Sequence, residues 1–164
     1  MFEPKSGRND FPPCRLVEAT EVAGWIEQAR SRYGIEGVTF LGGEPVRQAR
    51  GLARVAQLIR PLGLSMMLFT GYRLEELAQM GLPGVKVLHG LSDLVVDGRF
   101  VSSKLEQVLN WVGSTNQRFH LLTARYGPGI EYNPSFERGI EVRVGLSGEL
   151  KVNRWPETAS PDTM

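Results

Sequence analysis

Three short segments of the sequence could carry chemistry, and each follows an apolar run. They read Gly-Gly-Glu-Pro at residues 42–45, Thr-Gly-Tyr at 70–72 and Asp-Gly at 97–98. Two adjacent glycines have no Cβ atoms, so the backbone groups beside them can approach a ligand closely. The helix N-terminus that follows such a turn favours an anionic group. An ordinary strand-to-helix turn uses the same residues, and on the glycine pair alone it is the preferred interpretation.

Four further polar residues permit two interpretations each. Asp93 and Asp97 either contact the ribose of a nucleoside or organise the loop beside it, since an Asp-Gly pair is also a common turn. For the aspartates the two interpretations stay open. Asn116 and Gln117 either bind a substrate or satisfy their own loop, and here the loop is favoured.

The spacing of potential ligands does not indicate a metal site. His89 and His120 have no His-x-x-x-His or Cys-x-x-Cys pattern around them, so both are interpreted as structural. Met66 and Met67 are expected in the core rather than on a cofactor. The single Cys14 is interpreted as a structural or surface thiol.

The elements that would position these segments follow from the apolar spacing. Apolar residues three or four apart predict helices over residues 20–33, 52–59 and 74–78, the first capped by Thr20, with Trp25, Tyr33 and Ala78 facing the core. Short apolar runs predict strands at 37–41, 65–70, 94–96 and 119–123, and alternation at 140–144 and 150–152 predicts an antiparallel hairpin at the sheet edge. Such an order predicts an α/β domain with a mostly parallel sheet, in which residues 42, 70 and 97 share one end.

The composition of the 164-residue chain bounds its class. Its 41% hydrophobic and 23% charged residues are ordinary for a globular domain, and its net charge of +1 gives no field that would attract nucleic acid or an anionic membrane. It has no long uncharged apolar run, and its first residues lack the apolar stretch of a signal peptide. We therefore expect a cytoplasmic location.

A longer set of motifs resembles the activating enzymes of glycyl-radical enzymes, a radical S-adenosylmethionine (SAM) family. Residues 37–45 look like the strand and loop whose backbone holds the methionyl amine of SAM in that family, although Ser is commoner there at the place of Leu41. Residues 68–77, 93–100 and 113–118 resemble, in order, segments of the activating proteins of anaerobic ribonucleotide reductase. Residues 148–156 resemble the closing strand, so the resemblance spans residues 2–156.

The resemblance implies a fold, cofactors and partners. These are a partial (β/α) radical-SAM barrel, SAM with a [4Fe–4S] cluster, and a glycyl-radical enzyme as partner, first of all anaerobic ribonucleotide reductase. Flavodoxin or ferredoxin would donate electrons, and neither nucleic acid nor a membrane is an expected partner. It assigns no catalytic or metal-binding side chain here. The residues it associates with SAM are Gly42, Gly43, Glu44, Pro45, Thr70, Tyr72, Asp93 and Asp97.

One departure from the family is plain. The family holds its cluster with a CxxxCxxC segment, which is absent, and one thiolate cannot replace three. One explanation, which we favour, is that the sequence lacks an N-terminal stretch. That stretch would supply the family's first strand, and a protein without this strand would have an unpaired sheet edge. The other is that the protein is a degenerate, non-catalytic module that binds a nucleotide or a partner. We expect one radical-SAM-like domain over residues 1–156 and a disordered tail at 157–164.

Overall fold

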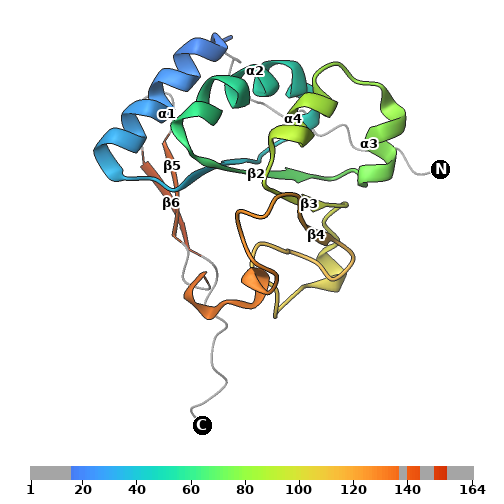
Figure 1. Cartoon of the computed structure of the whole chain (residues 1–164). Helices are drawn as coiled ribbons and strands as arrows, with labels where there is room; N and C mark the ends of the chain where they lie inside the picture. Colours follow the sequence, from blue (N-terminus) through green and yellow to red (C-terminus); the bar gives the residue numbers. More distant parts are fainter. Residues whose placement is uncertain (1–15, 137–139, 145–149, 155–164) are drawn as a thin grey trace, which may run out of the picture.

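The computed structural model describes residues 16–136, 140–144 and 150–154 (Figure 1). Its centre is a four-stranded sheet in the order β1 (Gly37–Phe40), β2 (Ser65–Thr70), β3 (Leu94–Asp97) and β4 (Arg118–Leu121). The first three strands are parallel, whereas β4 runs antiparallel to β3. The predicted α/β class with a mostly parallel sheet is confirmed. Because the sheet is open, its likeness to a barrel is only partial.

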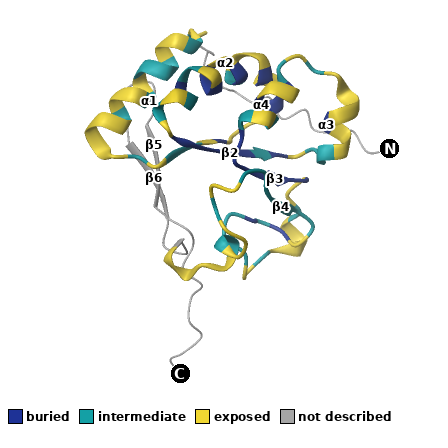
Figure 2. Cartoon of the chain, viewed as in Figure 1, coloured by how far each residue is buried: buried dark blue, intermediate teal, exposed yellow. Residues whose placement is uncertain are grey.

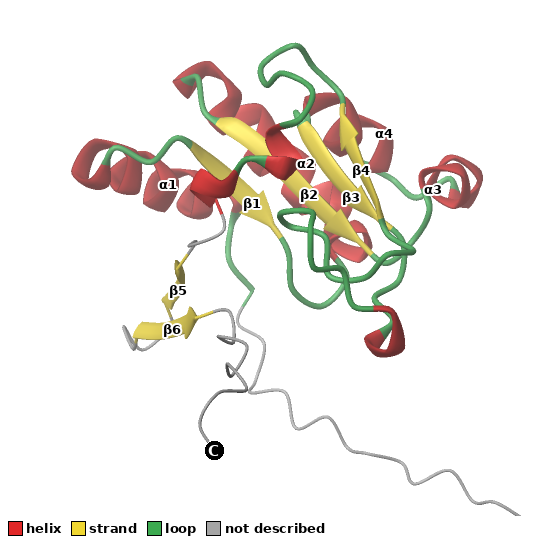
Figure 3. Ribbon diagram, turned by 90° about the horizontal axis from the view of Figure 1, so that it is seen from below, coloured by secondary structure: helices red, strands yellow, loops and turns green. Residues whose placement is uncertain are grey.

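Helices cover one face of this sheet. They are α1 (Ala19–Tyr33), α2 (Ala49–Ile59), α3 (Leu74–Met80) and α4 (Val85–Leu91), and in Figure 1 the first, second and fourth lie above the strands. Seen from below, the four strands lie side by side with the helices behind them (Figure 3). Five short 3-10 turns connect the elements: η1 (Pro45–Gln48), η2 (Arg60–Leu62), η3 (Ser102–Lys104), η4 (Ile130–Tyr132) and η5 (Pro134–Phe136). Among the described helices, none is long and apolar enough to cross a membrane.

The main core fills the space between the helices and the sheet, where Figure 2 shows the buried residues gathered. Phe40, Met66 and Leu68 reach it from the strands, and Ile59 and Leu88 reach it from α2 and α4. Buried strand residues alternate with residues on the other face because side chains point to opposite sides along a strand. As predicted, Met66 and Met67 are core residues, with exposed fractions of 0% and 7%.

The opposite face of the sheet is covered by the irregular segment that follows β3. Met67, Val96 and Val112 are buried there, and the Trp111 ring stacks on the Phe119 ring with centroids 5.8 Å apart. Trp111 has a φ of 64°, which is uncommon for a residue with a side chain. This segment takes the place that a covering helix has on the other face.

The C-terminal hairpin forms but not where we expected it. β5 (Ile140–Val144) and β6 (Leu150–Arg154) pair antiparallel in a separate two-stranded sheet. Its predicted position at the edge of the main sheet is therefore wrong, and the antiparallel edge strand there is β4. Cys14 and the tail at residues 157–164 lie outside the described residues.

Three predicted details of the helices are also wrong. The N-cap of α1 is Glu18 rather than Thr20. Trp25 and Tyr33 are exposed, because α1 packs on the core through Ala19, Val22, Ala23 and Ile26. Ala78 is exposed as well, and in α3 it is Leu77 that is buried.

Candidate ligand-binding edge of the sheet

The glycine loop, Thr70 and Asp97 lie at the same end of the sheet. In the register, Phe40 is opposite Leu68 and Thr70 is opposite Asp97. The loop that follows Phe40 therefore emerges beside Thr70, at the carboxyl end of the strands. This confirms the predicted arrangement of residues 42, 70 and 97. In open α/β sheets, that end is where ligands bind.

The glycine loop presents open backbone. Gly42 and Gly43 have φ angles of 89° and 53°, both in the left-handed region, and both residues are exposed. A Cβ built on either glycine would meet no heavy atom within 4 Å. The glycines are thus required by conformation and leave free space beside their peptide groups.

Glu44 fixes that loop to the neighbouring strand. Its Oε1 accepts hydrogen bonds from the Thr70 hydroxyl at 2.9 Å and from the Val46 N–H at 3.2 Å, and its Oε2 accepts one from the Gly71 N–H at 2.8 Å. Pro45, which follows, is buried as the first residue of η1. The Glu44 carboxylate is therefore occupied by its own protein and supports the loop.

Thr70 and Tyr72 are part of the same support. The Thr70 side chain is almost wholly buried, and its hydroxyl also accepts a hydrogen bond from the Tyr72 N–H at 3.2 Å. The Tyr72 ring packs against the main core. Their contacts hold the turn after β2 beside the glycine loop.

Asp97 is the buried centre of a partly exposed charge network at this edge. Its Oδ1 accepts a hydrogen bond from Arg118 Nε at 2.9 Å, and its Oδ2 accepts from the Leu74 N–H at 2.9 Å and from Arg118 Nη2. Arg73 Nη1 lies 3.5 Å from Oδ1. Arg118 also binds both oxygens of Glu75 on α3. The network ties the first turn of α3 to β3 and β4.

The charge state of Asp97 follows from these contacts. Burial disfavours the carboxylate, but the hydrogen bonds from Arg118 and Leu74 and the nearby His120 outweigh burial and lower the pKa of Asp97 to about 2. His120 Nε2 is 3.3 Å from Oδ1, without the alignment of a hydrogen bond. Asp97 is ionised at neutral pH and organises the loop.

Asp93 does not belong to this edge. It precedes β3, so four residues at about 3.3 Å each separate it from Asp97 by roughly 13 Å. Its side chain is fully buried and accepts hydrogen bonds from Arg60 at 2.8 Å, the Met66 N–H at 2.9 Å and Thr123 at 2.8 Å. Asp93 therefore joins β2, β3 and the end of β4, and it lies at the other end of β3 from Asp97.

The two amides near β4 donate hydrogen bonds to the segment after β3, but the buried Asn116 Oδ1 has no hydrogen-bond partner among the described residues. Asn116 Nδ2 donates to the Arg99 carbonyl at 2.7 Å, and Gln117 Nε2 donates to the Gly98 carbonyl at 2.9 Å. Gln117 Oε1 also accepts from the N–H groups of Gly113 and Ser114. The loop interpretation that we favoured for these residues agrees with these contacts.

Sequence reasoning missed Arg73, Arg118 and Glu75. Arg118 is opposite Asp97 in the antiparallel register. An alternation of Arg118 and His120 on β4, both facing the side of Asp97, was a signal that could have found it. The sequence gives no comparable signal for Arg73.

Comparison with known proteins bears on this edge. A family model described as a 4Fe-4S single cluster domain matches residues 9–120, more than half of the chain. The chain belongs to this family. The matched residues include β1 to β3, all but the last residue of β4, and every residue of the edge described above.

Two curated proteins with similar sequences indicate a more specific relationship. The chain is 34% identical over 98 residues to the anaerobic ribonucleoside-triphosphate reductase-activating protein of Vibrio cholerae, covering 57% of this chain and 60% of that protein. It is 31% identical over 96 residues to the protein of the same name from Escherichia coli K12, covering 56% and 60%. The chain thus spans about three fifths of the relatives it matches, and the resemblance noted in the sequence is confirmed. No solved structure matches it significantly.

The residues of this chain do not fit the cluster that the family name implies. Within the described residues, no group of three His, Cys, Asp or Glu side chains could hold a metal ion. The whole sequence has one cysteine, and [4Fe–4S] clusters are held by several thiolates.

The single cysteine bears on whether this chain can bind an iron–sulfur cluster. After anaerobic reconstitution with iron and sulfide, we expect this chain to bind no stoichiometric [4Fe–4S] cluster, because one thiolate cannot replace several. Iron analysis and visible absorption check this. Four irons per monomer that persist in Cys14→Ser would contradict it.

Proposed function

We propose that this domain supplies the SAM-binding edge of an activating system for anaerobic ribonucleotide reductase. The observation that carries the proposal is the exposed pair Gly42 and Gly43, fixed in the left-handed region at the carboxyl end of a parallel sheet. Free peptide groups there suit the charged amino and carboxylate ends of a methionyl group. Family membership and the names of the relatives support the same function.

Each residue of the edge has a role in this proposal. Gly42 and Gly43 bind the ligand through their backbone. Glu44 and Thr70 position that loop through their 2.9 Å hydrogen bond, and Asp97 anchors the next loop along the edge.

The rest of the chemistry lies beyond this chain's own residues. Reductive cleavage of SAM and abstraction of a hydrogen atom from a glycine of the reductase would belong to the whole system, with a flavodoxin or ferredoxin as electron donor. No side chain described here is assigned a part in those steps. This chain binds and orients the cofactor.

A second candidate is a non-catalytic module that binds a nucleotide or a partner. The single cysteine favours this candidate, because one thiolate cannot hold the iron–sulfur cluster on which the first function depends. The two candidates differ in which end of the ligand the glycine loop recognises. A SAM site recognises the amino-acid end, whereas a nucleotide site recognises the nucleoside or its phosphates.

Competition calorimetry separates the two. We expect SAM and S-adenosylhomocysteine to bind the chain, and adenosine or ATP at equal concentration not to displace them, because both favoured ligands carry the amino-acid end. Equal or tighter binding of ATP would support the nucleotide module. Binding of none of the four ligands would remove the SAM-binding proposal.

A further inference from the structure

The guanidinium group of Arg73 lies flat over the carboxyl end of β3. A Cβ on Gly98 would lie 3.2 Å from Cζ of Arg73, 3.3 Å from its Nη1 and 3.4 Å from its Nε. Because these three distances are nearly equal, the face of the guanidinium covers Gly98, and not its edge. The φ of 100° at Gly98 also favours glycine, so this position suits the close approach of the guanidinium.

Two contacts fix the guanidinium in its plane. Nη2 of Arg73 donates a hydrogen bond to the Asn116 carbonyl at 2.5 Å, and Nη1 lies 3.5 Å from Asp97 Oδ1. Although one face and both terminal nitrogens are engaged, the Arg73 side chain is 35% exposed. The exposed part is therefore the stem, Nε and the face turned away from Gly98. No described aromatic ring stacks on that face, since the cation–π contact in the described part of the chain joins Arg32 to Tyr33.

Arg118, the other arginine of this network, is engaged differently. Its Nε, Nη1 and Nη2 all donate to the carboxylates of Asp97 and Glu75, which neutralise its charge. It also lies on β4, one strand farther from the glycine loop than β3. Arg73 is thus the guanidinium of this edge that is both fixed in orientation and not closely paired with a carboxylate.

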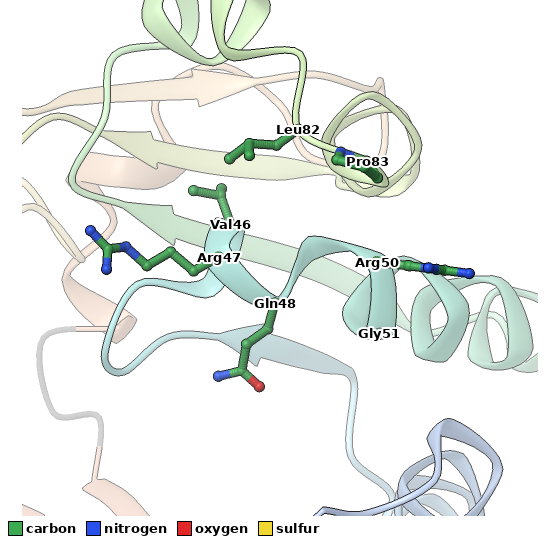
Figure 4. A pocket seen from close by; sticks show the side chains of 7 residues that line it. All are labelled: Val46, Arg47, Gln48, Arg50, Gly51, Leu82 and Pro83. Atoms are coloured by element: carbon green, nitrogen blue, oxygen red, sulfur yellow. The ribbon is translucent and has the colours of Figure 1, made fainter.

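The exposed arginines that follow the glycine loop do not offer a fixed plane. Arg47 and Arg50 line a shallow hollow of about 280 Å³, and Figure 4 shows their side chains pointing in opposite directions. Neither makes an ion pair or a side-chain hydrogen bond with another described residue. Val46, which also lines the hollow, is 2% exposed and belongs to the main core. The hollow is therefore not a competing site.

We propose that Arg73 is the platform on which the adenine of the bound ligand stacks. A guanidinium plane stacks on aromatic rings, and Arg does this better than Lys because its charge is spread over a plane. The platform over β3 is two strands from the glycine loop after β1, which is roughly 10 Å at the usual strand spacing. SAM in an extended conformation spans that distance from its amino-acid end to its adenine. This inference rests on the proposed function, since it takes Gly42 and Gly43 to hold the amino-acid end.

The Nε–H signal of Arg73 in the ¹⁵N-labelled chain tests the contact directly, and its loss in Arg73→Lys assigns it. The ring current of a stacked base moves the signals of protons above its face upfield. We expect SAM to move the Arg73 signal upfield and to shift the amide signals of Gly42 and Gly43. S-methylmethionine has the sulfonium and the amino-acid end but no nucleoside. It should shift the two glycines and leave the Arg73 signal unchanged.

Arg73→Lys keeps the positive charge and removes the plane. We expect it to weaken SAM binding about three- to tenfold in calorimetric titration and to leave the affinity for S-methylmethionine unchanged. Arg99→Lys, the same change at an exposed arginine next to Gly98, should leave both affinities unchanged.

Three results would overturn the platform while leaving the glycine loop as a SAM site. They are shifts at Gly42 and Gly43 without a shift of the Arg73 signal, equal effects of Arg73→Lys and Arg99→Lys on SAM binding, and an equal loss of SAM and S-methylmethionine binding in Arg73→Lys. The last result would mean that Arg73 only supports the loops. The absence of any SAM-induced shift at Gly42 and Gly43 would remove both this inference and the proposed function.

Discussion

Asp97→Ala is expected to lower the free energy of unfolding by about 2–4 kcal/mol. The substitution leaves the Leu74 N–H without its acceptor and takes from Arg118 its buried partner, while Arg118 keeps Glu75 and is 39% exposed in its side chain. Because Arg118 stays partly solvated and paired with Glu75, the loss of stability should be smaller than for breaking a fully buried ion pair. Urea unfolding followed by circular dichroism measures it.

Glu75→Ala is the matched control for that change. Glu75 pairs with Arg118 as well, but its side chain is 65% exposed. Removing that carboxylate should therefore lower the free energy of unfolding by at most about 1 kcal/mol. Equal losses for Asp97→Ala and Glu75→Ala would contradict the view that the buried contacts of Asp97 hold α3 to the sheet.

The same network gives the stability a pH dependence. The pKa of Asp97 is lowered in the folded protein from its ordinary 3.8 to about 2, and the pKa of Asp93 is lowered as well, in its case by hydrogen bonds that outweigh burial. Stabilisation from a lowered pKa is present above the unfolded value and is lost as the pH falls through the folded value. The Asp97 contribution should therefore fade between pH 4 and pH 2, and Asp97→Ala should flatten that decline.

Gly43→Val is expected to weaken SAM binding by roughly 30- to 1,000-fold, equivalent to about 2–4 kcal/mol. The protein itself leaves space for a side chain there, since a Cβ meets nothing within 4 Å, so any clash is with the ligand. The φ of 53° also disfavours a β-branched residue. Because this chain has one cysteine, the affinity measured on it reports polypeptide contacts alone.

Gly51→Val provides the control for that variant. Gly51 is exposed in α2, has no positive φ, and a Cβ there also meets nothing within 4 Å. We expect it to leave the SAM affinity unchanged in calorimetric titration, and Val is a slightly better helix former than Gly, so helix propensity gives no reason for a loss of stability. If Gly43→Val and Gly51→Val bind SAM equally, the glycine loop is only a turn.

The parts of the fold that were predictable are those with strong local patterns. The apolar run of β2 and the short run of β3 gave their strands, and the right-handed crossover rule put Gly42, Thr70 and Asp97 at one end. The short helix α4 was missed because Val85, Val87 and Gly90 are weak helix formers. It forms through packing, since Val85 and Leu88 are buried and α4 lies against α2.

The candidate site was harder to predict because its contacts are distant in sequence. Glu44 meets Thr70 26 positions later, and Arg118 meets Asp97 21 positions earlier, so no local pattern reveals that both carboxylates are occupied by the protein. The separation of Asp93 from Asp97 was hard to predict for a different reason. The motif that resembles the family contains both aspartates, but four residues of an extended strand carry them to opposite ends of the sheet.

A titration of the ¹⁵N-labelled chain with SAM, followed by amide chemical shifts, tests whether the glycine loop binds SAM. We expect the largest shifts at Gly42, Gly43 and Gly71, and unchanged amide shifts for Asp93 and Thr123 at the opposite end of the sheet. This experiment detects even weak binding and does not require a cluster. Saturating shifts confined to residues away from the glycine loop, or no shifts at Gly42 and Gly43 at millimolar SAM, would contradict a SAM-binding edge.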